Sequence, residues 1–226
     1  MPENRIYNNL LALPLFLGMS RKDLQQAAGQ TRFDFRKIAQ GETIVTEGEP
    51  CTHLYFLLDG DIMVKTYSTD RSYCIEEEIH APETFQSERI FGLHPHFTHT
   101  YIAQQDCSLL CLGKQDVMKL ATRFDIFRIN LLNLVSTQSQ KHNIRTRQSP
   151  PKTLEERIVR FIESNCVSHY GEKTIHIKMT RIAEEVNDSR LDVSKALNHL
   201  QNQGLIQLFR ERIYIPALEK LTNDKQ

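Results

Sequence analysis

The sequence lacks any apolar run long enough to cross a bilayer. The longest strongly apolar stretch near its start, residues 10–17, is far shorter than the roughly 20 residues that a transmembrane helix needs. No small-residue cleavage signal follows that stretch, which argues against export. A CxxC pair is also missing, because the five cysteines are scattered along the chain. Scattered, odd-numbered cysteines are typical of reduced thiols, so we expect a cytoplasmic protein without a membrane partner.

Net charge is absent as well, since 28 Lys and Arg residues balance 28 Asp and Glu residues. This balance indicates no partner, and it does not exclude nucleic acid, because binding depends on where the charge lies. The sequence has no glycine-rich phosphate loop, no nucleophile elbow and no HExxH-type motif, so we expect no enzymatic activity. With 40% apolar and 25% charged residues, the chain can bury an ordinary core in one or two domains.

Short β-rich runs dominate the first half of the sequence. Between residues 33 and 73 they are separated by turns such as Asp59-Gly60-Asp61, where glycine tolerates a left-handed backbone. Two more runs follow at residues 100–103 and 108–112. Many short strands separated by turns predict a β-sandwich or barrel rather than a βαβ fold.

A helical period replaces this pattern after Lys114. No proline or glycine occurs from there to about Arg147, which predicts one long helix that ends before Pro150 and Pro151. Its apolar stripe recurs at three- and four-residue steps, at Phe127, Leu131, Leu134 and Gln138. Such a stripe fits either packing on the same subunit or pairing with a second copy. After the prolines, Thr153 with Glu156 is typical of the start of another helix.

The sharpest local pattern lies between residues 179 and 200. Apolar positions at helical spacing define two short helices on either side of Asn187, a residue type that tolerates positive φ in a tight turn. Ser189, followed three residues later by Asp192, is typical of a helix N-cap. The spacing fits a helix-turn-helix whose second helix enters the major groove. An ordinary pair of helices with a solvated polar face is the alternative.

The outer face of the second helix, and the hairpin after it, carry side chains that suit DNA. Arg and Lys donate to guanine, and Asn pairs with adenine, whereas Asp192 is expected to serve as a cap. The runs at residues 206–208 and 212–215 predict a hairpin whose tip, residues 209–211, forms a basic wing near phosphates. The candidate DNA-binding residues are Thr180, Ser189, Arg190, Leu191, Ser194, Lys195, Asn198, Arg210 and Arg212.

In this order the segments resemble the Crp/Fnr family of bacterial transcription regulators over nearly the whole chain. The matching segments are residues 41–50, residues 54–60, the long helix, residues 189–197 and the hairpin after Gly204. The resemblance implies an α+β fold with an N-terminal β-roll of jelly-roll (double-stranded β-helix) type, similar to a cyclic-nucleotide-binding domain. The expected parts are this effector domain over residues 1–122, a dimerisation helix and hinge over 123–149, and a winged helix-turn-helix over 150–226.

The resemblance also implies a homodimer on a near-palindromic operator. Two recognition helices about 34 Å apart would then engage successive major grooves on one face of the DNA. In that arrangement the seam of the dimer is expected along the stripe of Phe127, Leu131, Leu134 and Gln138.

The segment that would hold an effector departs from the pattern of cyclic-AMP-binding members. Those members carry a Gly-Glu pair and, farther on, Arg-Ser or Arg-Thr. Here Ser87 stands in place of the glycine before Glu88, and no arginine precedes Thr98. An anionic phosphate would lack a fixed counter-charge, which argues against cyclic AMP. The candidate effector-pocket residues are Ser87, Glu88, Arg89, Thr98 and His99.

One histidine-rich stretch is the candidate for a metal or haem. It contains His94, His96 and His99, with Cys107 and Cys111 farther on, and imidazole and thiolate suit zinc, iron or haem. A polar loop between two strands explains the same residues, with both cysteines small and buried, and we favour that interpretation. Residues 1–50 contain no cysteine, which argues against the N-terminal iron–sulfur cluster of some relatives.

Together these features predict a homodimeric, sequence-specific DNA-binding regulator whose β-roll responds to an unidentified effector. If it activates transcription, RNA polymerase is a further expected partner. The alternative is a nucleotide-sensing module that acts on a protein partner. A salt series of DNA binding separates the two, because phosphate contacts make affinity fall steeply with salt.

Overall fold

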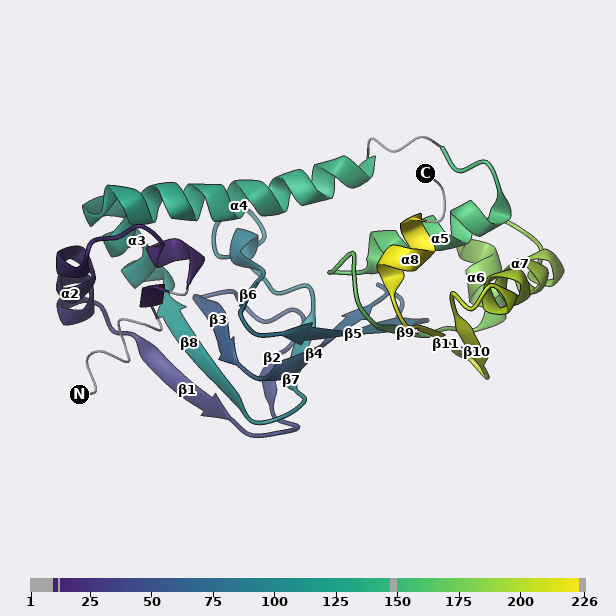
Figure 1. Ribbon diagram of the computed structural model, residues 1–226, viewed down its shortest axis with the longest axis horizontal. Coiled ribbons are helices and arrows are strands. Elements are labelled where there is room, and N and C mark those ends of the chain that lie inside the picture. The colour runs from purple at the N-terminus through teal and green to yellow at the C-terminus, as the bar shows by residue number, and fades with distance from the viewer. Residues whose placement is uncertain (1–9, 12, 147–149, 224–226) are drawn as a thin grey trace. The chain divides into compact units, whose positions relative to one another are not determined.

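The computed structural model describes residues 10–11, 13–146 and 150–223 (Figure 1). Of the predicted helix and hinge, residues 147–149 therefore lie outside the described part. Contacts group the chain into two units. The first contains residues 1–62, 80–98 and 102–147, and the second contains residues 63–79, 99–101 and 148–226. The second unit thus includes a hairpin from the N-terminal half of the chain. The domain boundaries expected from sequence, after residues 122 and 149, stay a prediction.

The first unit is built on an antiparallel sheet of four strands. Their order is β1 (Asp34–Ile38), β8 (Cys107–Gly113), β3 (His53–Asp59) and β6 (Glu83–Phe85). The short strand β2 (Thr43–Val45) and the helical segments η1 (Pro14–Phe16), α2 (Arg21–Gln30) and η2 (Ser87–Arg89) complete its N-terminal part. Gly60 follows β3 with a φ of +100°, and an added Cβ would lie 2.7 Å from Cys107 Sγ. The predicted glycine turn is therefore confirmed, and glycine is required there.

Two helices end the first unit, α3 (Lys114–Arg123) and α4 (Asp125–Thr146). The prediction of one uninterrupted helix from Lys114 is wrong, because Phe124 is extended (φ −120°, ψ 109°) and separates them. The break turns the Phe124 side chain into the core, where it is 8% exposed. α4 packs against η1, α3 and η2, and Asn130 Nδ2 donates to the carbonyl oxygens of Leu15 and Leu17.

The second unit contains the C-terminal helices and a sheet whose strands come from both halves of the chain. Its helices are α5 (Leu154–Asn165), α6 (Met179–Glu185), α7 (Arg190–Asn202) and α8 (Leu218–Asn223). Its strands run in the order β10 (Gln207–Phe209), β11 (Arg212–Ile215), β9 (Lys173–His176), β5 (Cys74–His80), β4 (Asp61–Tyr67) and β7 (Thr100–Ala103). The predicted N-cap of α5 is confirmed, since Thr153 Oγ1 accepts from the Glu156 amide at 3.2 Å.

The core of the second unit is one apolar cluster. Its central members are Ile158, Ile162, Ile175, Ile182, Val193, Leu197, Leu200 and Ile213. Tyr73 and Ile75 of the β4–β5 hairpin belong to the same cluster. The predicted α+β fold, with an N-terminal β-sandwich domain and a C-terminal helix-turn-helix, is confirmed. None of the described helices is both long and apolar enough to span a membrane.

Candidate nucleic-acid interface and effector segment

A tight turn joins α6 to α7. Asn187 has a φ of 50° there, and Ser189 caps α7 by accepting from the Asp192 amide at 3.1 Å. The Ser189 hydroxyl also donates to Asp192 Oδ2 at 2.7 Å. The hydrogen bond from Ser189 is the largest cause that lowers the pKa of the Asp192 carboxyl, and the neighbouring Lys195 is the next. The predicted turn and the Ser189 cap are confirmed. The Ser189 amide donates to Asp188 Oδ1 at 2.7 Å, so the Asp192 carboxylate binds the capping hydroxyl and not the main chain.

The turn is fixed from the side by Arg157 of α5. Its guanidinium donates to the carbonyl oxygen of Val186 at 2.9 Å and pairs with Asp188 Oδ2 at 2.5 Å. The inner face of α7 is anchored as well, because Val193 and Leu197 are fully buried. α7 is therefore held rigidly at its start and along one side, which is what a helix that reads DNA needs.

The outer face of α7 is open to solvent and polar. Arg190, Lys195 and Asn198 are exposed and Ser194 is half-buried, while Leu191 is 66% exposed. Lys195 Nζ lies 3.0 Å from Asp192 Oδ1, but an exposed pair of this kind contributes little and is easily exchanged for another partner.

The predicted hairpin wing is confirmed. β10 and β11 pair in antiparallel register, and Glu211 at the tip has a φ of 56°. Arg210 and Arg212 are exposed, and the Arg212 guanidinium lies 4.4 Å from the centre of the Phe209 ring. Beside the wing is a hollow of about 610 Å³, whose polar lining includes Ser72, His176, Lys178, Arg210, Glu211 and Arg212. Three cations face one acid in this hollow, which suits an anionic backbone. Thr180, the remaining candidate, is exposed near the start of α6.

The predicted effector segment forms the one-turn helix η2 and its surroundings. Ser87 is fully buried, and its Oγ has no hydrogen-bond partner among the described residues. Arg89 Nε is likewise buried without a hydrogen-bond partner in the described part of the chain, and it lies 3.7 Å from Glu88 Oε1. Two unsatisfied polar atoms within three residues mark a place where a small ligand or water can bind.

The position expected to carry a cation holds Phe97 instead. Phe97 is 2% exposed and packs edge-on against Tyr55, which stacks on Phe85. The Gln86 side chain hydrogen-bonds Thr98 twice. Its Nε2 donates to Thr98 Oγ1 at 2.5 Å, and its Oε1 accepts from the Thr98 amide. An aromatic cluster therefore stands at the position where the resemblance to cyclic-AMP-binding members places the counter-charge of the phosphate.

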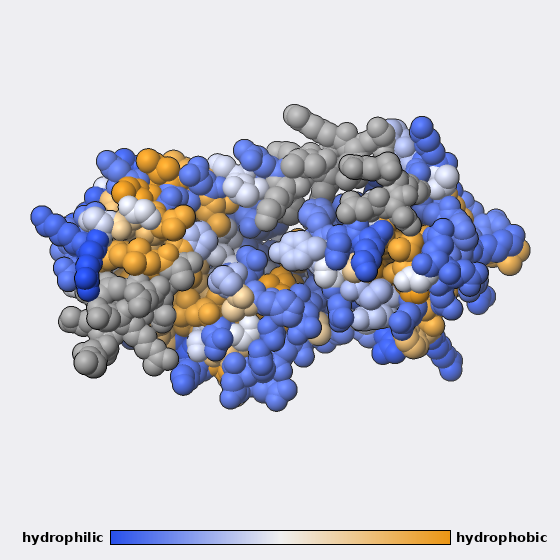
Figure 2. Space-filling model, in the orientation of Figure 1, coloured by the Kyte–Doolittle hydropathy of each residue, from blue (hydrophilic) through white to orange (hydrophobic). Residues whose placement is uncertain are grey.

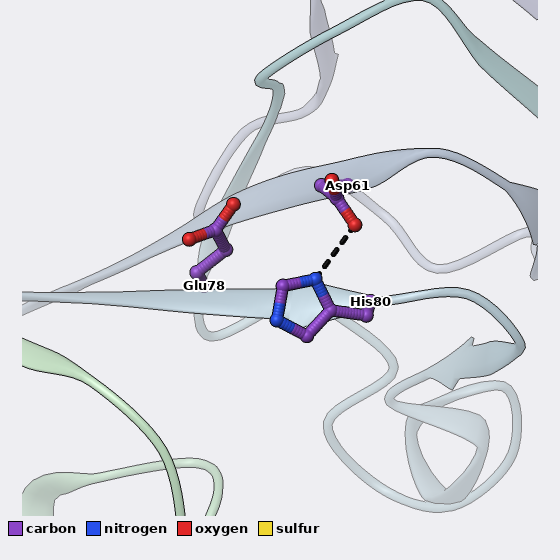
Figure 3. A group of neighbouring side chains, drawn as sticks. All are labelled: Asp61, Glu78 and His80. Atoms are coloured by element: carbon purple, nitrogen blue, oxygen red, sulfur yellow. Dashed lines mark hydrogen bonds and ion pairs between the residues drawn. The ribbon is translucent and has the colours of Figure 1, made fainter. Parts of the chain in front are cut away.

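The predicted histidines do not assemble into a metal centre. His94 and His96 are exposed, and His99 Nδ1 hydrogen-bonds Thr66 Oγ1 at 2.9 Å. In the described residues, three potential ligands come together elsewhere, on β4 and β5, as Asp61, Glu78 and His80. Figure 3 shows His80 Nδ1 directed at Asp61 Oδ1, 2.6 Å away.

The two cysteines beyond the histidines are buried. Cys107 is 2% and Cys111 1% exposed, and burial raises the pKa of the Cys111 thiol to about 11. Burial also raises the pKa of Cys107. Both cysteines are therefore small buried residues of β8, which is the placement that the favoured interpretation expected.

The predicted stripe on α4 divides between two environments. Phe127 and Leu131 are 0% and 8% exposed, and the Phe127 ring packs edge-on against Phe16 of η1 at 5.3 Å. These two residues therefore belong to the core of the first unit. Leu134 and Gln138 line a cavity of about 360 Å³ beside η1 and β6.

The exposed apolar residues of α4 lie on another face. Ile126, Ile129 and Leu132 are 40%, 55% and 61% exposed, and Figure 2 shows apolar surface over the first half of this helix. Three- and four-residue periodicity cannot tell which side of a helix the rest of its own unit covers, so the seam expected from sequence stays a prediction.

Two known families match the two parts of the chain. Residues 35–124 match the family described as "Cyclic nucleotide-binding domain", and residues 156–223 match the "Crp-like helix-turn-helix domain". The comparison with curated proteins found no match in sequence.

Solved structures share the fold at low sequence identity. The sensor domain of the transcriptional regulator DNR from Pseudomonas aeruginosa is 19% identical, covers 68% of this chain and 100% of that chain, and has a TM-score of 0.52. The c-di-GMP-responsive global regulator CLP from Xanthomonas campestris is 14% identical over 87% and 99%, with a TM-score of 0.50. The catabolite activator protein of Thermus thermophilus is 19% identical over 93% and 97%, with a TM-score of 0.49.

A cyclic-nucleotide-binding type of β-domain followed by a helix-turn-helix defines a class of transcription regulators, which are not enzymes. Because both families are matched in this order on one chain, the protein has the domain arrangement of the Crp-type regulators.

Proposed function

We propose that the protein is a homodimeric regulator that binds DNA in the bacterial cytoplasm, with α7 of each subunit in the major groove of a near-palindromic operator. One observation carries the proposal: α7 buries an apolar face and exposes Arg190, Lys195 and Asn198 on the opposite one. These side chains present the donors and acceptors that read base edges. Ser194 and Leu191 border them, and Leu191 suits a thymine methyl group.

Backbone contacts are assigned to the wing and its surroundings. Arg210, Arg212 and Lys178 are exposed and line one hollow, so a phosphate strand there would meet three cations. The hydroxyls of Thr180 and Ser189 lie at the starts of α6 and α7, where main-chain amides and the helix dipole favour phosphate.

A second copy of the chain is the partner proposed for the exposed face of α4. Ile129, Leu132, Ser136 and Ser139 are all exposed and follow a three-four-three spacing, the period of a coiled-coil seam. Residues 129–140 contain no charged side chain, although a solvated helix surface normally carries several. Both features suit a face that is covered by another helix.

The effector is proposed to bind at η2 as a small molecule with hydrogen-bonding groups. Ser87 Oγ and Arg89 Nε, buried and without hydrogen-bond partners among the described residues, support this position. Phe97, which stands where a cation would face the phosphate of cyclic AMP, argues against that nucleotide. RNA polymerase is the expected further partner if the protein activates transcription.

The test is selection of bound sequences from a pool of random DNA by the full-length protein, followed by affinity measurement over a salt series. We expect enrichment of paired half-sites with centres about 10 base pairs, one helical turn, apart or at a multiple of that distance. Affinity for the enriched site should fall steeply with salt. Absence of any enriched sequence, with salt-insensitive weak binding, would instead support the alternative of a module that acts on a protein partner.

A further inference from the structure

The winged helix-turn-helix receives a strand from the other half of the chain. β5 pairs with β9 in antiparallel register, with Ile75 opposite Ile175 and Glu77 opposite Lys173. β9 lies between β11 and β5. Without β5, β9 would be an edge strand whose buried amide and carbonyl groups lack partners, which is costly.

The same hairpin contributes to the apolar core around α5 and α7. Tyr73 and Ile75 belong to the core cluster of this unit and are 9% and 0% exposed. The Tyr73 ring packs edge-on against Phe161 with 5.3 Å between centroids, and its hydroxyl donates to Asn165 Oδ1 at 3.1 Å. Removing the hairpin would uncover this side of α5 to water.

A fully buried ion pair lies at the end of the β5–β9 ladder. Lys173 Nζ is 3.1 Å from Glu77 Oε1, and both side chains are 0% exposed. Glu77 also accepts from the amides of Val167 and Ser168, at 2.6 and 3.0 Å. Lys173 Nζ donates to the carbonyl oxygen of Tyr170 at 2.7 Å. Both charged groups thus also bind the main chain of the loop that connects α5 to β9.

This pair makes the pairing register-specific. A slip of two residues would place Lys173 opposite Ile75 or Ile79, so that a buried ammonium group would face an aliphatic side chain. An uncompensated buried charge is strongly destabilising, whereas a satisfied buried pair contributes more to specificity than to stability. Only one alignment of the hairpin therefore satisfies β9.

We propose that the β4–β5 hairpin is an integral strand of the DNA-binding unit, keyed in register by the buried pair Glu77–Lys173, and that DNA is bound only while β5 is seated on β9. The inference rests on the proposed DNA-binding function and adds a component to it. Seating is compatible with DNA, because Arg190 and Lys195 stay exposed in the seated form. Ser72 at the hairpin tip also lines the basic hollow beside the wing. A signal that unseats the hairpin would therefore switch off DNA binding.

The first test is hydrogen–deuterium exchange of the full-length protein. In the Glu77→Gln variant, Lys173 keeps a buried charge without its counter-charge, so peptides covering Cys74–His80 and Lys173–His176 should exchange on the order of 100-fold faster. Peptides from β3 and β8 in the first unit should not change. Glu78→Gln is the matched control, because Glu78 is the exposed carboxylate next along β5.

A double variant separates the charge from the general effect of substitution. In Glu77→Gln/Lys173→Met no buried charge remains, and the amide oxygen at position 77 still accepts from the main chain. Protection in both strands should return to within a few-fold of the wild type. Unchanged exchange in Glu77→Gln, or a double variant that exchanges faster than the single one, would overturn the role of the pair.

The second test fixes the strands covalently without touching the buried pair. Cys74 lies directly opposite His176, and opposite residues in an antiparallel pair have Cα atoms about 4.5–5.5 Å apart, within the range of a disulfide. In a His176→Cys variant, diamide should take up both thiol hydrogens and join the two strands. The control variant Cys74→Ser/His176→Cys should form no such intrachain bond.

Measurements of DNA affinity then test whether DNA binding requires β5 to be seated on β9. The oxidised His176→Cys protein should bind its selected DNA within about threefold of its reduced form, while Glu77→Gln should lose at least tenfold. Loss of binding on oxidation, or full affinity in Glu77→Gln with exchange increased, would overturn the coupling. If the wild type binds no DNA at all, the proposed function fails and the coupling with it, while exchange and cross-linking still decide whether β5 is seated.

Discussion

Two helices of this protein expose one long face each, and the faces differ in chemistry. α4 exposes Ile126, Ile129 and Leu132, with no charged residue between 129 and 140. α7 exposes Arg190, Lys195 and Asn198 over a similar length. Both helices bury the opposite face in the core of their own unit.

The difference shows that exposure alone does not identify a partner. Exposure of an uncharged apolar face to water is unfavourable, and its burial against another apolar face lowers the free energy. A cationic and amide-bearing face stays solvated until it meets an anionic, hydrogen-bonding surface such as the DNA groove. The two faces therefore suit the two partners proposed for them, a second copy of the chain for α4 and DNA for α7. Three variants, one of them a double substitution, break or sharpen this comparison.

The largest effect is expected from giving α4 the chemistry of a solvated face. In Ile129→Glu/Leu132→Glu, two carboxylates per subunit would be buried without partners in the dimer, so the dimer dissociation constant should rise by at least about 100-fold. Sedimentation velocity over a concentration series measures the change. The control is Met118→Glu, which makes the same kind of change at a residue of α3 that is 55% exposed. A double variant that remains as dimeric as the wild type would remove α4 from the interface.

An intermediate effect is expected from α7. Lys195→Ala should weaken binding to the selected operator by ~1–3 kcal/mol and relax preference at one base position, because a direct base contact is lost. Competition between operator and random DNA measures this. Lys119→Ala, an exposed lysine of α3 that is likewise paired three residues away with an aspartate, should change neither affinity. An equal loss on operator and random DNA would make Lys195 a phosphate contact.

The smallest effect is expected at the start of α7. Ser189→Ala removes the acceptor for the Asp192 amide, and loss of an N-cap costs about 1 kcal/mol of stability. Urea unfolding followed by circular dichroism should show the loss, while Ser189→Thr, which keeps the hydroxyl, should stay close to the wild type. Equal stability of the Ala and Thr variants would show that the cap contributes nothing measurable.

Local features of the helix-turn-helix could be predicted because they depend on neighbouring residues. The positive φ of Asn187, the cap at Ser189 and the cap at Thr153 each follow from a side chain and the main chain within three residues of it. The order of strands and helices, read together with the family resemblance, was sufficient for the fold class.

Features that depend on distant partners could not be predicted in this way. β9 is short and begins with Lys173, so its sequence indicates a polar loop as readily as a strand buried between β11 and β5. The helix α2 was not predicted, although Ser20 caps its start and accepts from the Asp23 amide at 3.1 Å, a local pattern like that of Ser189 and Asp192. For α4, the spacing of Phe127 and Leu131 marks an apolar stripe correctly, but only the packing on Phe16 shows that this stripe belongs to the subunit core.

The effector segment could be predicted only in part from the sequence. The absence of an arginine before Thr98 was visible in the sequence, and the argument against cyclic AMP that rests on it stays a prediction. The bonds from Gln86 to Thr98 and the unsatisfied atoms of Ser87 and Arg89 were not visible, because each depends on the turn geometry of η2.

The origin of β5 has a consequence for protein engineering. A chimera made at Pro150, carrying the C-terminal segment of this chain on the sensor of another regulator, would inherit Lys173 but leave Glu77 behind. In the grafted segment the Lys173 ammonium group would lack its counter-charge, and β9 would lack the strand that pairs with it. Transplanting residues 63–79 together with the C-terminal segment would preserve both, so the transferable module is discontinuous in the gene although it is continuous in space.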